Sequence, residues 1–170
     1  MGLEKSLNLC LASQQIRKLI SEGRIVLPSF DESRIQPSSF EPTIGNDIFV
    51  LDSETTGLFR PNKKKTIYES LLHLPNRRRR KGNVSGGFEL KKGFSYLIKL
   101  EEKLRLVEGE YVKSSPKSSH GRLFLNTRLV GDYNPCFDEL SHNYSQDKEI
   151  ALWLLVQPLG NFFILRIIMA

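Results

Sequence analysis

The sequence predicts an all-β domain, a β-sandwich or distorted barrel, with one short N-terminal helix. Apolar runs of strand length follow one another at close intervals from Ile25 onward, and glycines, prolines, serines and asparagines separate them. Convincing helical periodicity occurs only before Gly23. Short strands without intervening helices are typical of sandwiches and barrels rather than of parallel α/β sheets.

The N-terminal helix is expected to begin at Ser13 and to end before Gly23. A serine side chain can accept a hydrogen bond from an unpaired amide of the first turn, so Ser13 is the predicted cap. Ile16, Leu19 and Ile20 then form one apolar stripe at helical spacing. Glycine suits the position that follows the last helical residue.

The strands are predicted from apolar runs between turn-forming residues. The last two come from the stretch 150–170, which is apolar enough to suggest a membrane anchor. Pro158 and Gly160 give its middle the chemistry of a turn, so two buried strands are the preferred interpretation. The predicted strands are Ile25–Leu27, Asp47–Leu51, Phe94–Leu100, Leu104–Leu106, Tyr111–Val112, Arg122–Val130, Ile150–Val156 and Phe162–Ile168.

Residues 53–87 are polar and basic and are expected to form a flexible insertion in a single domain that covers residues 1–170. The insertion contains Lys63-Lys64-Lys65 and the run Arg77–Lys81. It is either a solvated basic loop or a surface that contacts a phosphate backbone. No aromatic residues alternate with the arginines, so stacking on single-stranded bases is not indicated.

Composition limits the class of protein only broadly. A chain of 170 residues with 39% hydrophobic residues fits one globular domain. A formal charge of +6 favours polyanionic partners, but it does not separate nucleic acids, nucleoside triphosphates and acidic membranes. Cys10 and Cys136 are the only cysteines, so a disulfide framework is implausible. Because the first apolar run is too short for an export signal, a cytoplasmic protein is expected.

Zinc-dependent cytidine deamination is excluded by the residues that surround Cys136. That chemistry needs a His-x-Glu pair and a Pro-Cys-x-x-Cys pair. Here Pro135-Cys136 is followed by Phe137-Asp138-Glu139, and the sequence contains no His-x-Glu. His73, His120 and His142 are scattered along the chain, and each is interpreted as a surface or loop histidine. No protein-bound metal site is expected.

The informative segment is the Ser-rich stretch from Ser114 to Leu123, followed by Thr127–Asp132. Residues 117–122 bring together a lysine, two hydroxyl groups and an arginine. Such a turn can offer hydrogen-bond donors and two fixed positive charges to an oligophosphate. Taken alone, the pattern is a weak signal, and a solvated Ser-rich turn is the preferred interpretation.

Pro116-Lys117-Ser118-Ser119-His120-Gly121-Arg122-Leu123, followed by Thr127-Arg128-Leu129, resembles the signature of dCTP deaminases in the dCTP deaminase/dUTPase superfamily. The chain is most similar to the first domain of the long bacterial branch, which has two tandem domains. Residues 13–20 are similar to the opening helix of that branch, and Gln36-Pro37-Ser38-Ser39-Phe40 to its Gln-Pro-Ala-Ser-Leu-Asp segment. The resemblance implies a dUTPase-like fold.

The resemblance also implies conversion of dCTP to dUTP without a metal at the reacting carbon, with Mg²⁺ carried by the triphosphate. Ser118 and Arg122 take the positions that orient the reacting groups. Lys117 and Ser119 would hold phosphate, Asp138 would lie near the sugar, and the backbone from Leu129 to Gly131 would line the base pocket. A homotrimer with sites between subunits is implied. The implied nucleotide contacts are Lys117, Ser118, Ser119, Arg122, Leu129, Val130, Gly131 and Asp138.

The sequence departs from the family at the general base. When Leu152–Pro158 is aligned with the family's Leu-Tyr-Leu-Glu-Ile-Ser-Pro, Leu155 stands at the glutamate position. Glu149 is the nearest carboxylate, but six residues along a strand span roughly 20 Å. Glu149 is therefore a catalytic candidate only if the strand register differs, and otherwise a charge at the start of a strand.

Two other functions stay open. One is a catalytically inactive dUTPase-like domain that binds nucleotides or other subunits, which Leu155 would explain. The other is a polyanion-binding module that uses Arg77–Lys81. The sequence stops at Ala170, where the family continues into a further strand. A truncated domain, a degenerate gene product and a partial sequence all fit this end, and the sequence does not rank them.

Overall fold

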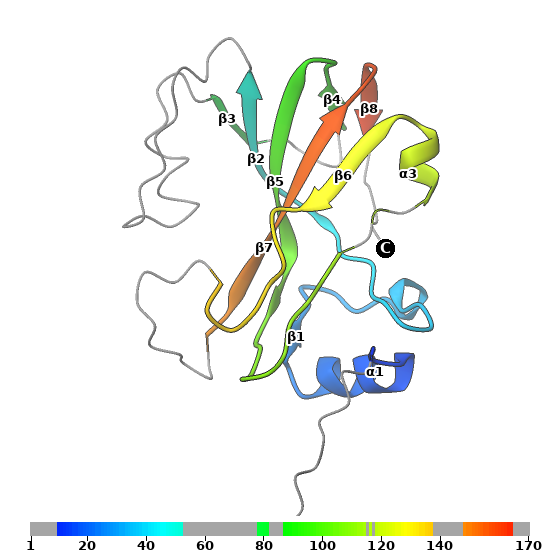
Figure 1. Ribbon diagram of the computed structural model, residues 1–170, viewed down its shortest axis with the longest axis vertical. Helices are drawn as coiled ribbons and strands as arrows, with labels where there is room; N and C mark the ends of the chain where they lie inside the picture. Colours follow the sequence, from blue (N-terminus) through cyan, green and yellow to red (C-terminus); the bar gives the residue numbers. More distant parts are fainter. Residues whose placement is uncertain are drawn as a thin grey trace, which may run out of the picture.

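The structure is a computed structural model that describes residues 10–52, 78–81, 87–114, 116, 118–137 and 148–164. A twisted antiparallel sheet forms most of the described part, with the short helix α1 at one end and a two-stranded sheet near the other (Figure 1). The predicted all-β architecture with one N-terminal helix is confirmed.

The main sheet has the strand order β3-β2-β5-β7-β6, and β1 pairs with β5 outside this path. Every recorded strand pair in this sheet is antiparallel, and β5 and β7 lie in the middle of the sheet. A separate pair is formed by β4 and β8. The strands are β1 Ile25–Val26, β2 Ile44–Asp52, β3 Arg78–Lys81, β4 Phe88–Leu90, β5 Phe94–Leu104, β6 Leu125–Leu129, β7 Ile150–Pro158 and β8 Phe162–Ile164.

Side chains alternate between the two faces of this sheet, because successive residues of a strand point in opposite directions. The larger apolar cluster includes Ile48 and Ile98 together with Leu154. The smaller cluster lies on the other face and contains their neighbours in sequence, Phe49 of β2, Leu97 of β5 and Trp153 of β7. The sheet therefore buries apolar side chains on both faces.

Gly45 stands where β2 changes register against β5, between Ile44 and Ile48. A Cβ atom at Gly45 would lie 2.6 Å from the Lys99 carbonyl oxygen. Because backbone cannot retreat as a flexible side chain can, this close approach requires glycine.

Helix α1 spans Ser13–Ser21, but its N-cap is Ala12 rather than Ser13. The Ser13 amide donates to the Pro37 carbonyl at 2.8 Å, and the Ser13 hydroxyl contacts Gln14. The Gln15 side chain accepts from the Ala12 amide at 2.8 Å. The predicted cap was wrong because the contact with Pro37 makes Ser13 the first helical residue.

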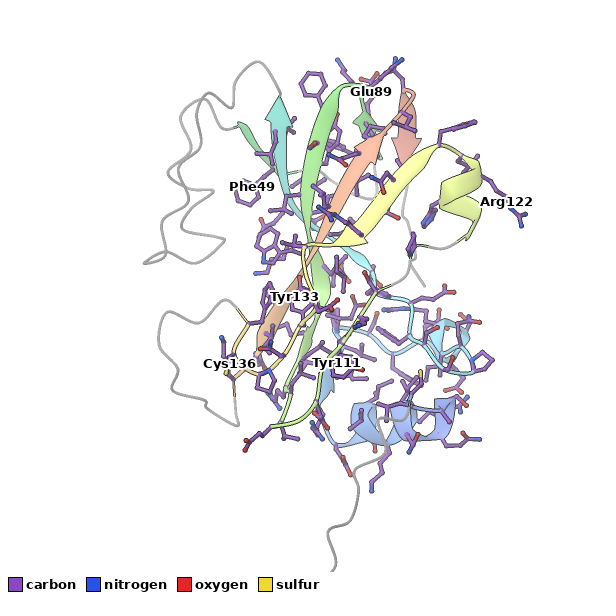
Figure 2. All side chains as sticks on the ribbon, viewed as in Figure 1. Phe49, Glu89, Tyr111, Arg122, Tyr133 and Cys136 are labelled. Carbon is purple, nitrogen blue, oxygen red and sulfur yellow. The ribbon has the colours of Figure 1, made fainter. Side chains whose placement is uncertain are left out.

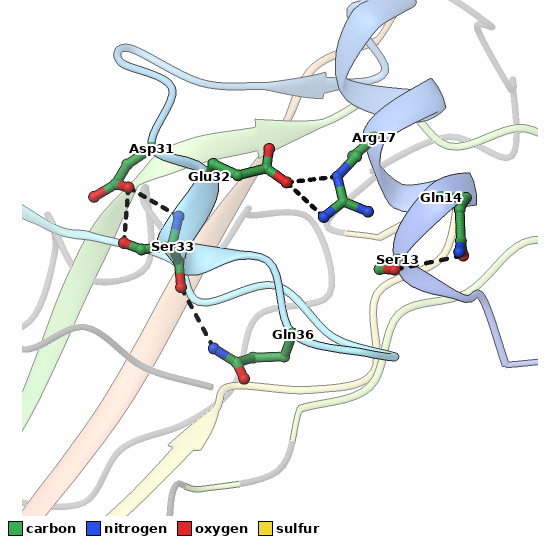
Figure 3. A network of polar contacts seen from close by, with 7 residues as sticks. All are labelled: Ser13, Gln14, Arg17, Asp31, Glu32, Ser33 and Gln36. Atoms are coloured by element: carbon green, nitrogen blue, oxygen red, sulfur yellow. Dashed lines mark hydrogen bonds and ion pairs between the residues drawn. The ribbon is translucent and has the colours of Figure 1, made fainter.

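A network of polar contacts joins α1 to the 3₁₀ helix η1, Glu32–Arg34 (Figure 3). Arg17 donates to Glu32 at 2.6 Å. Asp31 accepts from the amide of Ser33 at 2.9 Å and from its hydroxyl at 2.7 Å, and thus caps η1. These hydrogen bonds lower the pKa of Asp31.

A buried ion pair connects the N-terminal segment to the sheet. Arg34 is paired with Glu102 of β5, and their side chains are 5% and 0% exposed. Glu102 also accepts from the Thr43 amide at 2.7 Å, while Arg34 donates to the Glu41 carbonyl at 2.8 Å. Buried charges need such partners, so this pair fixes the position of the segment before β2.

The structure corrects several predicted boundaries. Tyr111–Val112 is not a strand, because Val112 makes only an isolated bridge with Tyr133. The strand predicted at Phe94–Leu100 continues to Leu104 as β5, and the rest of the predicted strand Leu104–Leu106 is not a strand. Arg122 is helical, and β6 starts at Leu125. β3 lies inside the predicted insertion, whereas residues 53–77 and 82–86 lie outside the described residues.

Within the described ranges, no helix is long and apolar enough to cross a membrane.

Candidate functional site

The Ser-rich turn forms a short helix at one edge of the sheet. Helix α3 spans Ser118–Arg122 and packs beside β6 (Figure 1). Ser114, which precedes it, accepts a hydrogen bond from the Leu129 amide at 3.0 Å. This bond joins the segment that leads into α3 to the end of β6. Two parts of the predicted site, α3 and the segment that starts at Leu129, are thus brought to the same edge.

Arg122 is the last residue of α3, and its exposed side chain points away from the sheet (Figure 2). Ser118 and Ser119 open the same helix. Lys117 and Asp138 lie outside the described residues. The structure therefore places three of the predicted nucleotide contacts on one short element with an accessible cation.

The chain turns sharply after α3. The Leu123 and Phe124 amides donate to the carbonyls of His120 and Gly121, both at 3.1 Å. Phe124 has a φ of 58°, in the left-handed region that costs a residue with a Cβ roughly 1–2 kcal/mol. The Phe124 carbonyl accepts from the Leu159 amide at 3.0 Å. These contacts hold the turn that separates Arg122 from β6.

The predicted base-pocket segment begins at the end of β6. The Leu129 amide donates to Ser114, as described above, and the Val130 amide donates to the Trp153 carbonyl at 3.0 Å. These two amides already have acceptors within the chain. A base held by Leu129, Val130 and Gly131 would accordingly use other atoms of the segment.

Leu155 lies within β7, opposite Arg128 of β6 and Leu97 of β5. It is half-buried and packs against the apolar cluster formed by Phe49, Leu97 and Trp153. The structure therefore gives Leu155 an ordinary packing role. A hydrocarbon side chain cannot act as a proton acceptor at this position.

Glu149 precedes β7 and is engaged by two cations. Its carboxylate accepts from Lys103 at 2.6 Å and from Arg105 at 2.8 Å. The hydrogen bond from Lys103, followed by that from Arg105, holds the pKa of Glu149 below its ordinary value of 4.5. A depressed pKa keeps the group ionised but makes it a poor proton acceptor.

Glu149 and α3 lie near opposite ends of β7. Leu125, just after α3, pairs with Pro158, whereas Glu149 precedes Ile150 at the other end of the strand. At ~3.3 Å per residue the intervening strand spans roughly 30 Å. Within one chain the structure does not bring Glu149 together with Ser118 and Arg122. Leu155 is closer, three residues along the strand from Pro158, or about 10 Å.

Sequence reasoning missed other polar groups beside α3. Thr127 is 2% exposed, and its hydroxyl oxygen has no hydrogen-bond partner in the described part of the chain. Its position between the inward-facing Leu125 and Leu129 was a signal that Thr127 would point inward. On the opposite face, the exposed Gln157 accepts from Asn126 at 3.2 Å and donates to Ser95 at 3.0 Å. These bonds join polar side chains of β6, β7 and β5.

No cluster of three His, Cys, Asp or Glu side chains with the spacing of a metal site occurs among the described residues.

An antiparallel β domain that carries a Ser- and Arg-containing turn at one edge of its sheet is the class that these observations define. The chain belongs to the family described as 2'-deoxycytidine 5'-triphosphate deaminase (DCD) N-terminal domain, which residues 8–164 match. The resemblance based on Ser118, Arg122 and their neighbours is therefore confirmed at the level of the family.

A relative agrees with this assignment, and a solved structure shares the fold. The chain is 30% identical over 125 residues to "dCTP deaminase, dUMP-forming" from Coprothermobacter proteolyticus, an alignment that covers 74% of this chain and 63% of that protein. It resembles the crystal structure of 2'-deoxycytidine 5'-triphosphate deaminase from Agrobacterium tumefaciens with a TM-score of 0.70 and 23% identity. That match covers 94% of this chain and 44% of the other, and it shows the shared fold. The chain thus spans less than two thirds of both relatives.

Proposed function

We propose that this domain binds dCTP and serves its conversion to dUTP, in which water adds to C4 of cytosine and ammonia leaves. The observation that carries the proposal is the exposed Arg122 on α3, in a chain that belongs to this family. An arginine can form paired, charge-assisted hydrogen bonds with phosphate. We assign Arg122 and Ser118 to orienting the reacting groups.

The remaining nucleotide contacts follow the resemblance. Lys117 and Ser119 would bind phosphate, and Asp138 would lie near the sugar. The segment from Leu129 to Gly131 would line the base pocket, and its position at the edge that carries α3 supports this assignment.

We also propose that magnesium enters with the triphosphate. Mg²⁺ is commonly bound through substrate phosphates and water together with few protein ligands. The described residues near α3 offer Arg122 rather than a group of carboxylates, which fits a metal that is carried by the nucleotide. The ion would neutralise part of the phosphate charge.

The expected assembly is a homotrimer with sites between subunits, as the resemblance implies. Leu155 cannot accept a proton, so the acceptor for the attacking water must come from another residue, subunit or segment. A site between subunits would allow a neighbouring chain to supply it. Sedimentation of the purified chain, with and without dCTP, measures the oligomeric state directly.

A second candidate function is nucleotide binding without turnover. It is favoured by the packing of Leu155 against Phe49, Leu97 and Trp153, which leaves an apolar side chain where the resemblance places a base. The same turn would then hold the nucleotide for recognition or for contact with other subunits.

Incubation with dCTP and magnesium, followed by chromatography for dUTP, dUMP and ammonia, separates the two candidates. Thermal shift with dCTP, dUTP and duplex DNA measures binding in parallel. Stabilisation by dCTP without product identifies the binding function. Stabilisation by DNA alone would instead favour a polyanion-binding module and contradict both nucleotide proposals.

A further inference from the structure

Phe124 combines two properties that rarely occur together in one side chain. Its φ of 58° lies in a region that bulky residues seldom adopt. It is also 68% exposed, the largest exposed fraction among the large hydrophobic side chains recorded as exposed in the described residues. Within this chain, burial of the ring therefore does not explain why the strained backbone persists.

The conformation of Phe124 is fixed by its surroundings. Its amide donates to the Gly121 carbonyl and its carbonyl accepts from the Leu159 amide, so both sides of the peptide are held. Unusual backbone conformations that the surrounding structure holds in place concentrate at functional sites. Here they hold an aromatic ring at the surface, directly before the inward-facing Leu125 of β6.

Phe124 follows Arg122 by two residues, at the edge where the nucleotide is proposed to bind. A nucleotide presents charged phosphates at one end and a flat, largely apolar base at the other. A guanidinium beside an exposed ring matches both parts, because bases stack on aromatic side chains while arginine pairs with phosphate.

We propose that Phe124 is a substrate-contacting residue that packs against the pyrimidine of the bound nucleotide. This inference rests on the proposed function, because it assigns the contact with the base in a site where Arg122 is proposed to contact the same nucleotide. Leu123 and Leu159 are exposed beside Phe124, so the rival explanation is an apolar contact with another protein chain.

Phe124→Gly is the informative variant, because glycine removes the ring and adopts a positive φ without strain. Calorimetric titration with magnesium dCTP should show affinity roughly ten-fold lower or weaker still, in line with base–aromatic stacking. Affinity for magnesium tripolyphosphate, which has no base, should stay unchanged. Phe124→Trp should retain dCTP binding, and the melting temperature of Phe124→Gly should not fall.

Phe30→Ala is the matched control, since Phe30 is also exposed but lies in the segment before η1. Equal dCTP affinity in Phe124→Gly and the wild type would overturn the inference. So would loss of dCTP binding that is reproduced by Leu159→Ala and accompanied by a smaller sedimenting species, because the patch would then be a contact between chains. If the wild type does not bind dCTP, the proposed function fails as well. If Arg122→Ala weakens binding and Phe124→Gly does not, only the inference fails.

Discussion

The two ends of β7 differ in how their polar groups are used. At the Ile150 end, Glu149 lies between Lys103 and Arg105, and Arg105 also donates to the Gly23 carbonyl at 3.2 Å. At the Pro158 end, Arg122 and Phe124 are exposed beside the strand. One end satisfies its charges within the chain, whereas the other presents a cation and a ring to solvent. The comparison indicates that Glu149 supports the fold, and it agrees with the proposal that the nucleotide binds near α3.

The largest expected effect concerns Leu155. The wild type should deaminate dCTP very slowly, and Leu155→Glu should raise the rate, because a positioned base contributes about 10²–10⁴-fold. The introduced carboxylate would lie across from Arg128 of β6. Chromatographic product formation measures the rate, and Leu155→Gln, with the same shape but no carboxylate, is the control. Rapid wild-type deamination, or equal rates in both variants, would contradict the alignment of β7.

The next effect concerns the buried pair of Arg34 and Glu102. Glu102→Leu should lower the free energy of unfolding by about 3–5 kcal/mol, because it leaves the Arg34 charge buried without its partner. Urea unfolding measures the change. The double variant with Arg34→Met should recover part of it, and exposed Glu89→Ala should change little. A loss below 1 kcal/mol in Glu102→Leu would mean that solvent reaches Arg34.

A moderate effect on nucleotide affinity is expected for Arg122, at the Pro158 end of β7. Arg122→Ala should weaken magnesium dCTP binding by about 1.5–3 kcal/mol, the range for hydrogen bonds to charged groups. Arg79→Ala is the matched control, because Arg79 lies in β3, at the opposite edge of the sheet from β6. Calorimetric titration of both variants provides the measurement. An equal loss in both would show that net charge, and not the turn, determines affinity.

The smallest effect is the change in stability expected for Glu149, at the Ile150 end of β7. Because the folded-state pKa of Glu149 is lowered, its stabilising contribution is present above about pH 4.5 and is lost as the pH falls through the folded-state value. The melting temperature of Glu149→Gln should therefore lie slightly below that of the wild type at neutral pH, and the difference should vanish in acid. Melting curves between about pH 3 and 7 test this. If deamination were robust and Glu149→Gln abolished it, Glu149 would be the base.

Most of the fold could be predicted where apolar pattern and turn chemistry agree. The predicted turn chemistry around Gly160 separated β7 from β8, although Pro158 itself ends β7, and the stripe of Ile16, Leu19 and Ile20 located α1. β3 was not predicted, because an edge strand of arginine and lysine has no apolar alternation. Its strand structure depends on its pairing with β2. α3 was not predicted, because five residues are too few to show helical periodicity.

The candidate site was only partly visible in the sequence. Family resemblance located Arg122 and the substitution at Leu155, both of which are local patterns. The positive φ of Phe124 depends on a hydrogen bond from Leu159, which is distant in the chain, so no local pattern signals it. The partners of Glu149 are likewise 44 and 46 positions away. Such pairings arise from strand register, which composition and spacing do not reveal.

The run Arg78–Lys81 has a further consequence for the behaviour of the protein in solution. Its strand, β3, pairs with β2 on one side, and in the described part of the chain no strand covers its other side. An open strand edge is a template on which a second sheet can grow and aggregate. Four consecutive cations oppose this growth, because a second copy would have to bring its own positive strand alongside. The basic run that the sequence offered as a contact for polyanions thus also has the charge pattern that opposes edge-to-edge aggregation.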